Sequence, residues 1–166
     1  MALLEILQYP DPRLRTKAAP VTHVDAALRK QVDDMYETMY EAKGVGLAAT
    51  QVNIHQQLFT MDISKDSNEP MCVVNPKIVY KEGVQYEAEG CLSVVEAFDK
   101  VERALIVHME GTDLDGKAIK LEAEGLLAVC IQHELDHLNG ILFIDHLSKL
   151  KQDRIRKKTE KSNRRE

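Results

Sequence analysis

The stretch "QHELDHLNG", residues 132–140, places two histidines four positions apart, with a glutamate directly after the first. On a helix, this spacing puts His133 and His137 on one face, where both imidazoles can bind the same divalent metal ion. From Glu124 to Leu138 the chain is apolar almost all round, apart from these His and Glu side chains. A helix of that composition is buried, and buried polar groups need partners. The stretch therefore predicts a central helix that carries metal ligands in the core and ends at Gly140.

A catalytic metal centre commonly has three protein ligands and one open position, so a third ligand is needed. A histidine three residues beyond Gly140 would continue the motif, but residue 143 is Phe. Cys130 shares the histidine face, yet its distance in sequence from His137 corresponds to about 10 Å along a helix axis. We therefore expect Cys130 to line a pocket rather than to bind the metal. Cys72 lies inside an apolar run, which indicates a small core residue.

Cys91 is the remaining cysteine, and it lies in "EGCLS", residues 89–93. Gly90, directly before it, allows the backbone to turn at a strand edge and present a thiolate. One Cys and two His form a tetrahedral site whose fourth position is open. An acidic ligand further along the chain is disfavoured, because the stretch after His146 is strongly basic and its first acid is Asp153. The sequence therefore predicts a centre made of this cysteine and the two histidines.

Glu134 cannot bind the same metal from its place beside His133, but its carboxylate can reach a water molecule at the open position. Such a carboxylate can take a proton from water and later give it to a leaving group. Three apolar residues of the helix, Leu126, Val129 and Cys130, lie one and two turns before His133. We expect them to line an apolar pocket beside the metal.

Two further sets of polar residues are assigned to structure rather than to chemistry. Asp136 points away from the histidine face, so we expect a carboxylate that supports the site without binding the metal. The other histidines belong to no motif and are expected at the surface or in ordinary packing; they are His23, His55, His108 and His146.

Apolar periodicity and turn residues place the other elements. A single apolar stripe, which includes Leu28, Val32 and Met39, predicts a helix from about Asp25 to Lys43, ended by Gly44. Short β-branched or alternating runs predict strands at 58–63, 71–75 and 77–80, and a hairpin of 104–110 with 117–123 around the turn 112–116. Strands and helices are segregated along the chain. This order predicts an α+β fold, with antiparallel sheets around a central HExxH helix, an N-terminal helix and a basic C-terminal helix.

Composition bounds the remaining possibilities. The chain has 166 residues, an apolar fraction of 44%, a charged fraction of 30% and a net charge of −5. These values are typical of a soluble globular protein and predict no overall attraction to DNA. The longest apolar run, "LLAVCI", is too short for a bilayer, and "MALLEILQYPDPRLR" lacks the pattern of a secretory signal. For these two reasons we expect no membrane partner. The chain has three cysteines, an odd number, so we expect free thiols in a protein of the reducing cytoplasm.

Charge is distributed unevenly. Residues 149–166 contain nine Lys or Arg and three Asp or Glu, a net charge of +6, so the rest of the chain carries −11. No repeat or Gly/Ser linker separates the two parts. We therefore predict a single catalytic domain at residues 1–147 and a basic helical tail at 148–166 appended to it.

Three motifs in order, "GVGLAATQ" (44–51), "EGCLS" (89–93) and "QHELDH" (132–137), resemble those of peptide deformylase. The similarity extends from "LQYPDPRLR" to the basic tail and is greatest to the bacterial type with a helical C-terminus. The resemblance implies hydrolysis of the N-formyl group from the initiator methionine of nascent polypeptides. It also implies one divalent metal, natively Fe(II), which Ni, Co or Zn can replace. Relatives of this type further imply docking on the ribosome through the tail.

The resemblance also gives roles to residues outside the helix. It assigns the stabilisation of the oxyanion to the Gln51 side-chain amide and to the Leu92 backbone N–H. Gly44 and Gly46 would let the backbone approach the substrate closely, and Val45 would add to the pocket for methionine. Two alternatives remain open: a general HExxH metallopeptidase, and a ribosome- or RNA-associated metal-binding module without catalysis. The cysteine ligand disfavours the first, and the lack of a fourth ligand disfavours the second.

The chain departs from the family pattern after "EGCLS". Val95 occupies a place where the family commonly has proline, and Phe98 occupies one where it commonly has arginine. Proline fixes φ and lacks an N–H, so Val95 predicts a looser loop. Phe98 offers only apolar contact. We therefore expect the chemistry to be retained and the positioning of the peptide beyond methionine to be altered.

Overall fold

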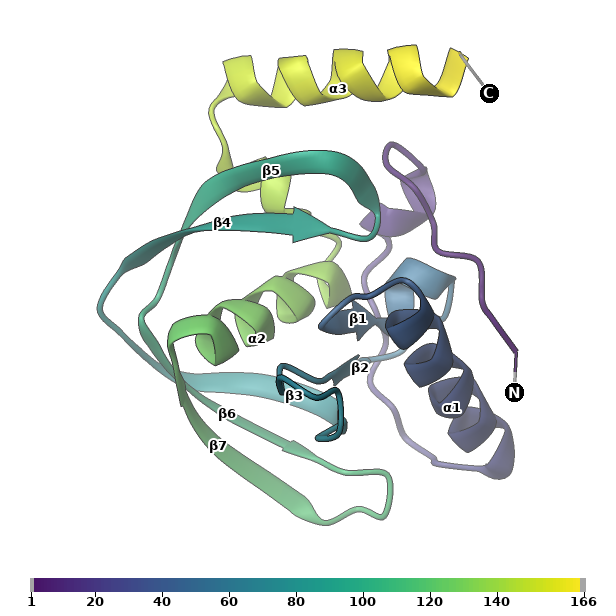
Figure 1. Ribbon diagram of the computed structural model, residues 1–166. Coiled ribbons are helices and arrows are strands. Elements are labelled where there is room, and N and C mark those ends of the chain that lie inside the picture. The colour runs from purple at the N-terminus through teal and green to yellow at the C-terminus, as the bar shows by residue number, and fades with distance from the viewer. Residues whose placement is uncertain (1, 165–166) are drawn as a thin grey trace.

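The computed structural model describes residues 2–164 (Figure 1). Within that range the α-helices are α1 (Ala26–Glu41), α2 (Gly125–Leu138) and α3 (Lys149–Arg164), and short 3-10 helices are η1 (Pro12–Arg15), η2 (Ala49–Val52) and η3 (Phe143–His146). The strands are β1 (Gly46–Ala48), β2 (Leu58–Met61), β3 (Met71–Glu82), β4 (Gln85–Cys91), β5 (Val94–Arg103), β6 (Ile106–Thr112) and β7 (Ala118–Glu124). The predicted α+β class with antiparallel sheets is confirmed. No helix in the described range is long and apolar enough to cross a membrane.

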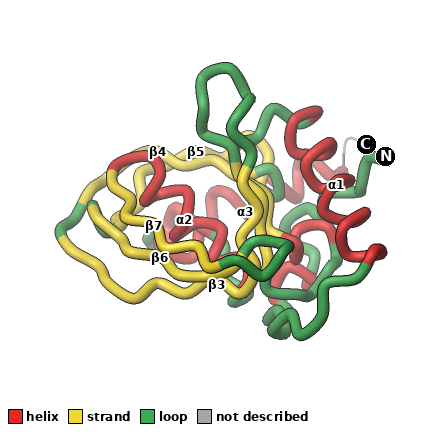
Figure 2. Tube along the Cα trace, turned by 90° about the horizontal axis from the view of Figure 1, so that it is seen from below, coloured by secondary structure: helices red, strands yellow, loops and turns green. Residues whose placement is uncertain are grey.

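The strands form one sheet of five and one sheet of two. The larger sheet has the order β1-β2-β3-β6-β7, and the smaller sheet pairs β4 with β5. Figure 1 shows α2 between the two sheets, and Figure 2 shows α1 at the opposite end of the molecule from the β4–β5 pair. The apolar face of α2, with Ala128 and Ile131 fully buried, packs on the inner face of the five-stranded sheet. Burying one such isoleucine side chain contributes about 2 kcal/mol to stability.

The prediction of two short strands at 71–75 and 77–80 was wrong, because they are one continuous strand, β3. Pro76 lies where the register with β6 shifts, between the pairs made by Val74 and Lys77. Proline has no N–H to donate, and a bulge removes the need for that hydrogen bond. Proline therefore interrupts the ladder here without ending the strand.

Helix α1 begins as predicted and ends slightly earlier. The Asp25 side chain accepts a hydrogen bond from Leu28 N at 2.8 Å, which caps the N-terminus. The helix ends at Glu41 rather than at Lys43, and Lys43 takes the left-handed conformation after it, with φ of 59°. Gly44 N then donates to Met39 O at 2.9 Å, which closes the helix end and directs the chain into β1.

Gly140 follows α2 as predicted. Its φ is 76°, a left-handed conformation that glycine adopts without strain. A Cβ at this position would also lie 2.5 Å from the Arg15 carbonyl oxygen, so only glycine lets the two segments meet. The end of the helix is therefore fixed by backbone conformation and by packing.

The β4–β5 sheet was not predicted from the sequence, because only one of the seven residues of β4 is buried and the strand lacks an apolar face. Its register is irregular: Glu89 pairs with Asp99 and Cys91 pairs with Val94, so residues 95–98 lie opposite Gly90 alone. We call residues 95–98 the β5 bulge. Figure 1 shows α3 lying along β5. Lys151 Nζ contacts Asp99 Oδ1 at 3.1 Å and Lys158 Nζ donates to Glu96 O at 2.9 Å, so α3 is attached to the bulge and to its flank.

Candidate metal centre

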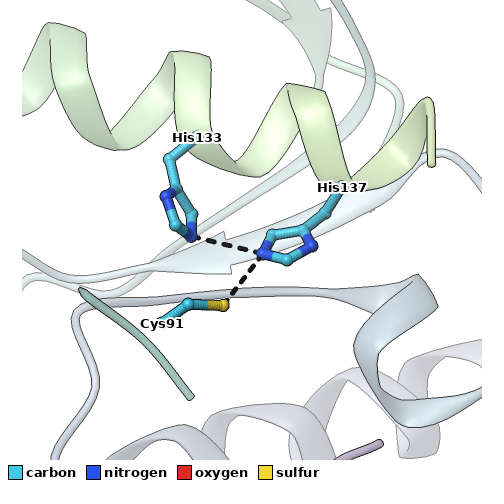
Figure 3. A group of neighbouring side chains, drawn as sticks. All are labelled: Cys91, His133 and His137. Atoms are coloured by element: carbon cyan, nitrogen blue, oxygen red, sulfur yellow. Dashed lines mark hydrogen bonds between the residues drawn. The ribbon is translucent and has the colours of Figure 1, made fainter. Parts of the chain in front are cut away.

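The side chains of Cys91, His133 and His137 meet between β4 and α2 (Figure 3). Cys91 Sγ lies 3.2 Å from His137 Nε2, which lies 3.2 Å from His133 Nε2. Two nitrogens bound tetrahedrally to one metal at about 2.1 Å would be about 3.4 Å apart. The three potential ligand atoms lie within 4.8 Å of one another, and no other such group of three occurs among residues 2–164. They are therefore spaced to hold one metal ion.

A buried carboxylate orients the first histidine. His133 Nδ1 lies 2.9 Å from Glu89 Oε1, so the opposite ring nitrogen faces the other two ligand atoms. Arg103 holds both oxygens of Glu89, with Nε to Oε2 at 2.8 Å and Nη2 to Oε1 at 2.9 Å. Burial raises the pKa of Glu89, but hydrogen bonds from Arg103 and His133 outweigh it and bring that pKa down to about 2. The carboxylate is therefore ionised and can fix the ring.

The same arginine connects this carboxylate to a second one. Arg103 Nη1 donates to Asp136 Oδ2 at 2.6 Å, and His146 Nε2 lies 2.8 Å from the same oxygen. Asp136 thus supports the centre from outside the ligand group, as predicted. His146 is at the surface, as predicted, with its side chain 37% exposed, and it also joins this network through Asp136.

Glu89 and Arg103 support the ligand group and were not predicted from the sequence. Alternation along a strand places Glu89 on the same side as Cys91, two residues later, and this alternation could have indicated Glu89. Arg103 had no comparable sequence signal. It reaches Glu89 only because β4 and β5 pair antiparallel, which brings the far end of β5 back over α2.

Glu134 is buried beside the ligand group and faces residues 44–46, which we call the glycine loop. A Cβ on Gly46 would lie 2.3 Å from Glu134 Oε2, so the absence of a side chain at Gly46 makes room for the carboxylate. Its other oxygen, Oε1, is buried with no hydrogen-bond partner among the described residues. Burial raises the pKa of Glu134 to about 7. A carboxylate with that pKa and a free oxygen is suited to exchange a proton near neutral pH.

Two residues adjoin Cys91 from other directions. Gln51 is buried, and its Oε1 accepts from Ala48 N at 2.9 Å, which fixes the orientation of the amide. Its Nε2 donates to Ser93 Oγ at 3.0 Å and lies 3.6 Å from Cys91 Sγ. Leu92 is in the turn after Cys91, and its carbonyl accepts from Gln8 Nε2 at 2.9 Å. The amide of Gln51 and the peptide of Leu92 are thus held close to the ligand group.

The three cysteines have different environments. Cys91 is half-buried among the ligands, whereas Cys130 is buried next to the glycine loop and lies outside the ligand group. Burial raises the pKa of Cys130 well above its usual value and the pKa of Cys72 to about 12, so both thiols stay protonated. The structure therefore separates one thiol that can bind a metal from two that fill apolar space.

A cavity of about 390 Å³ opens beside the ligand group. It brings together every residue predicted to bind substrate: Gly44, Val45, Gly46, Leu126, Val129 and Cys130. Val129 and Cys130 are buried, whereas Val45 and Leu126 are 48% and 61% exposed, so the cavity has an apolar inner part and an apolar rim. A larger hollow of about 750 Å³ lies beside Arg103 and Asp136 and includes none of the three ligand residues.

Convergent ligand atoms, a buried carboxylate and an apolar cavity beside them are the features of a metal-dependent hydrolase. Residues 3–153 match the family model described as polypeptide deformylase. The peptide deformylases of Chromobacterium violaceum and Pseudomonas aeruginosa are 58% and 56% identical to this chain, and cover 98% and 99% of it over 99% and 98% of their own lengths. The chain belongs to the polypeptide deformylase family, which confirms the resemblance of its three motifs.

Solved structures agree with this assignment. A peptide deformylase from Legionella pneumophila is 46% identical and superposes with a TM-score of 0.94, covering 98% of this chain and 96% of its own. The Ehrlichia chaffeensis enzyme, solved in complex with actinonin, is 40% identical, with a TM-score of 0.94 and 99% of both chains covered. The likeness therefore extends over nearly the whole of each chain.

Proposed function

We propose that this protein removes the N-formyl group from the initiator methionine of nascent polypeptides, using one metal ion held by Cys91, His133 and His137. The observation that carries the proposal is the convergence of these ligand atoms beside Glu134, whose Oε1 is buried without a partner. An unpartnered buried oxygen is costly unless a ligand or water occupies the space beside it. A bound water that attacks the formyl carbon would satisfy that oxygen.

The donor set is compatible with several divalent metals. One thiolate and two imidazoles suit iron, nickel, cobalt and zinc, and membership of the deformylase family favours Fe(II) as the native ion. When bound, the metal supplies Lewis acidity, which polarises the formyl carbonyl and lowers the pKa of water. Burial lowers the pKa of His137 well below its usual value, so this ring stays neutral and keeps a lone pair for the metal.

Glu134 carries the proton in this proposal. Its carboxylate accepts a proton from the attacking water and delivers it to the nitrogen of the leaving amine, and formate is released. The pKa of about 7, raised by burial, supports both directions of transfer near neutral pH. Glu134 is not assigned as a metal ligand, because the ligand from this turn of α2 is the adjacent His133.

Charge that develops on the formyl oxygen needs hydrogen-bond donors that are already in place. We assign this task to the Gln51 amide and the Leu92 N–H, both next to Cys91. The bond from Ala48 N to Gln51 Oε1 fixes the orientation of the amide, so that its Nε2 points toward the centre. Donors fixed in advance stabilise an oxyanion without reorganisation during the reaction.

The apolar cavity is proposed to bind the methionine side chain. Val129 and Cys130 form its buried part, and Gly44, Val45 and Gly46 also line it. An unbranched, polarizable thioether fits such a lining, and a neutral Cys130 thiol adds no charge. The backbone at both glycines can approach the substrate closely.

We assign residues 1–147 to the catalytic domain and residues 148–166 to a basic tail that docks on the ribosome in the cytoplasm. The described part of the tail is α3, on which several basic side chains are exposed, among them Lys151, Arg154 and Lys157. Their charge contrasts with the acidic remainder of the chain. Attraction to the phosphates of ribosomal RNA would weaken steeply with salt.

The decisive experiment combines metal analysis with product analysis. Protein purified without oxygen should contain about one equivalent of metal and release formate from formyl-Met peptides. The same preparation should leave internal peptide bonds intact, which separates a deformylase from a general metallopeptidase. Metal-loaded protein that releases no formate would overturn the proposal and favour a non-catalytic metal-binding module.

A further inference from the structure

The β5 bulge places an aromatic side chain at the mouth of the cavity. Phe98 is 75% exposed, more than any other large apolar side chain in the described part of the chain. It also lines the cavity beside the metal ligands. A solvent-exposed phenyl ring that borders an active site differs from an apolar residue scattered on the surface, because bound substrate can cover it.

The main chain beneath Phe98 supports its ring. A Cβ on Gly90 would lie 2.4 Å and 2.7 Å from two ring atoms of Phe98, so the ring rests against a backbone position that only glycine leaves open. Gly90 directly precedes the metal ligand Cys91. The ring therefore lies against the residue that precedes the ligand Cys91, with most of its surface open to solvent.

Phe98 belongs to an apolar rim built from three separate elements. Val45 from the glycine loop and Leu126 from α2 also line the cavity, and they are 48% and 61% exposed. Three charged residues also line the cavity: Lys43 is exposed, whereas Glu89 and Glu134 are buried in its inner part. A mouth with this composition offers mainly apolar contacts to whatever passes through it.

We propose that Phe98 is a specificity-determining residue that contacts the side chain of one of the two residues after methionine, and favours an apolar side chain there. The inference rests on the proposed function, which places the formyl group at the metal ligands and methionine in the inner cavity. The residues after methionine must then extend out of the cavity across its apolar rim. Phe98 lies against Gly90, the neighbour of Cys91, and an extended chain advances about 3.3 Å per residue, so we place Phe98 beside one of the first two residues beyond methionine.

The test uses formyl-Met tripeptides in which Leu, Ser or Asp occupies the second or the third position. Wild-type enzyme should prefer Leu over Ser by about five- to tenfold in kcat/KM at one of these positions, the gain expected when about 50 Å² of apolar surface is covered. Phe98→Ala should remove most of this preference through a higher KM for the Leu peptide, with kcat little changed. Phe98→Tyr keeps the ring and should retain the preference.

Tyr86→Ala is the matched control, because Tyr86 is an exposed aromatic residue of the same small sheet that does not line the cavity. It should leave the preference unchanged. Equal Leu-to-Ser ratios for wild type and Phe98→Ala at both positions would overturn the inference, while formate release by both would leave the proposed function standing. If wild-type enzyme releases no formate from any peptide, the proposed function fails and this inference fails with it.

Discussion

Replacing Arg103 by Met should destabilise the metal-free protein by about 3–5 kcal/mol, the usual cost of removing one partner from a buried ion pair. The side chains of Arg103 and Glu89 are each 4% exposed, and two hydrogen bonds join them. Methionine fills a similar volume but leaves the Glu89 carboxylate buried without its counter-charge. It also removes the bond of 2.6 Å to Asp136.

The same substitution should weaken metal binding. Glu89 fixes the ring of His133, and loss of such a supporting contact typically lowers metal affinity by about 10- to 100-fold. Urea unfolding of the metal-free protein would measure the first effect. Competition with a chelator would measure the second, on protein that is folded under the conditions used.

Arg13→Met is the control for this prediction. Arg13 makes a similar two-bond contact with Asp11, but its side chain is 51% exposed, so its loss should leave stability almost unchanged. The double variant Arg103→Met with Glu89→Gln should recover part of the lost stability, because no unpaired carboxylate remains at residue 89. If Arg103→Met costs no more than Arg13→Met, the network is not the structural support described here.

Three further outcomes are expected. Glu134→Gln should keep the metal and the fold and lower kcat by about 10²- to 10⁴-fold, whereas Cys91→Ser should lose the metal. Formate release close to the wild-type rate by metal-loaded Glu134→Gln would contradict the proton-transfer role. Activity should decay in air when iron is bound and persist with nickel, because a thiolate-bound Fe(II) open to solvent invites oxidation of the metal and of Cys91, and equal half-lives would count against this. Removal of residues 149–166 should spare hydrolysis of short formyl-Met peptides and abolish co-sedimentation with ribosomes at low salt, and unchanged co-sedimentation would refute the docking role of the tail.

Local spacing made the metal ligands on α2 predictable. His133 and His137 are one helical turn apart, so their shared face follows from the sequence alone. Cys91 was reached by elimination among three cysteines, and the structure brings it to the same point. The segregation of strands and helices likewise predicted an α+β fold.

The supporting residues were hidden, because their contacts depend on strand pairing. Arg103 lies opposite Gln85 in the paired strands, and its side chain reaches Glu89 further along β4. Strand β4 itself has too few buried side chains to be recognised from the sequence. Pro76 had the opposite effect, since it suggested a break where the strand only bulges. Sequence patterns report which face of a single element is buried, whereas these features depend on how two elements align.

The attachment of α3 to the β5 bulge bears on how a growing chain would meet the enzyme. The helix is fixed to the strand that borders the cavity mouth, through Lys158 and Glu96 within the bulge. If the enzyme is bound to the ribosome through α3, the mouth of its cavity keeps a fixed orientation and stays close to the bound helix. Tethering of this kind gives the cavity an effective concentration in about the millimolar range near the emerging N-terminus, so that capture does not depend on free diffusion of the enzyme. Weak contacts beyond methionine would then suffice, because capture of an emerging N-terminus becomes a nearly intramolecular event.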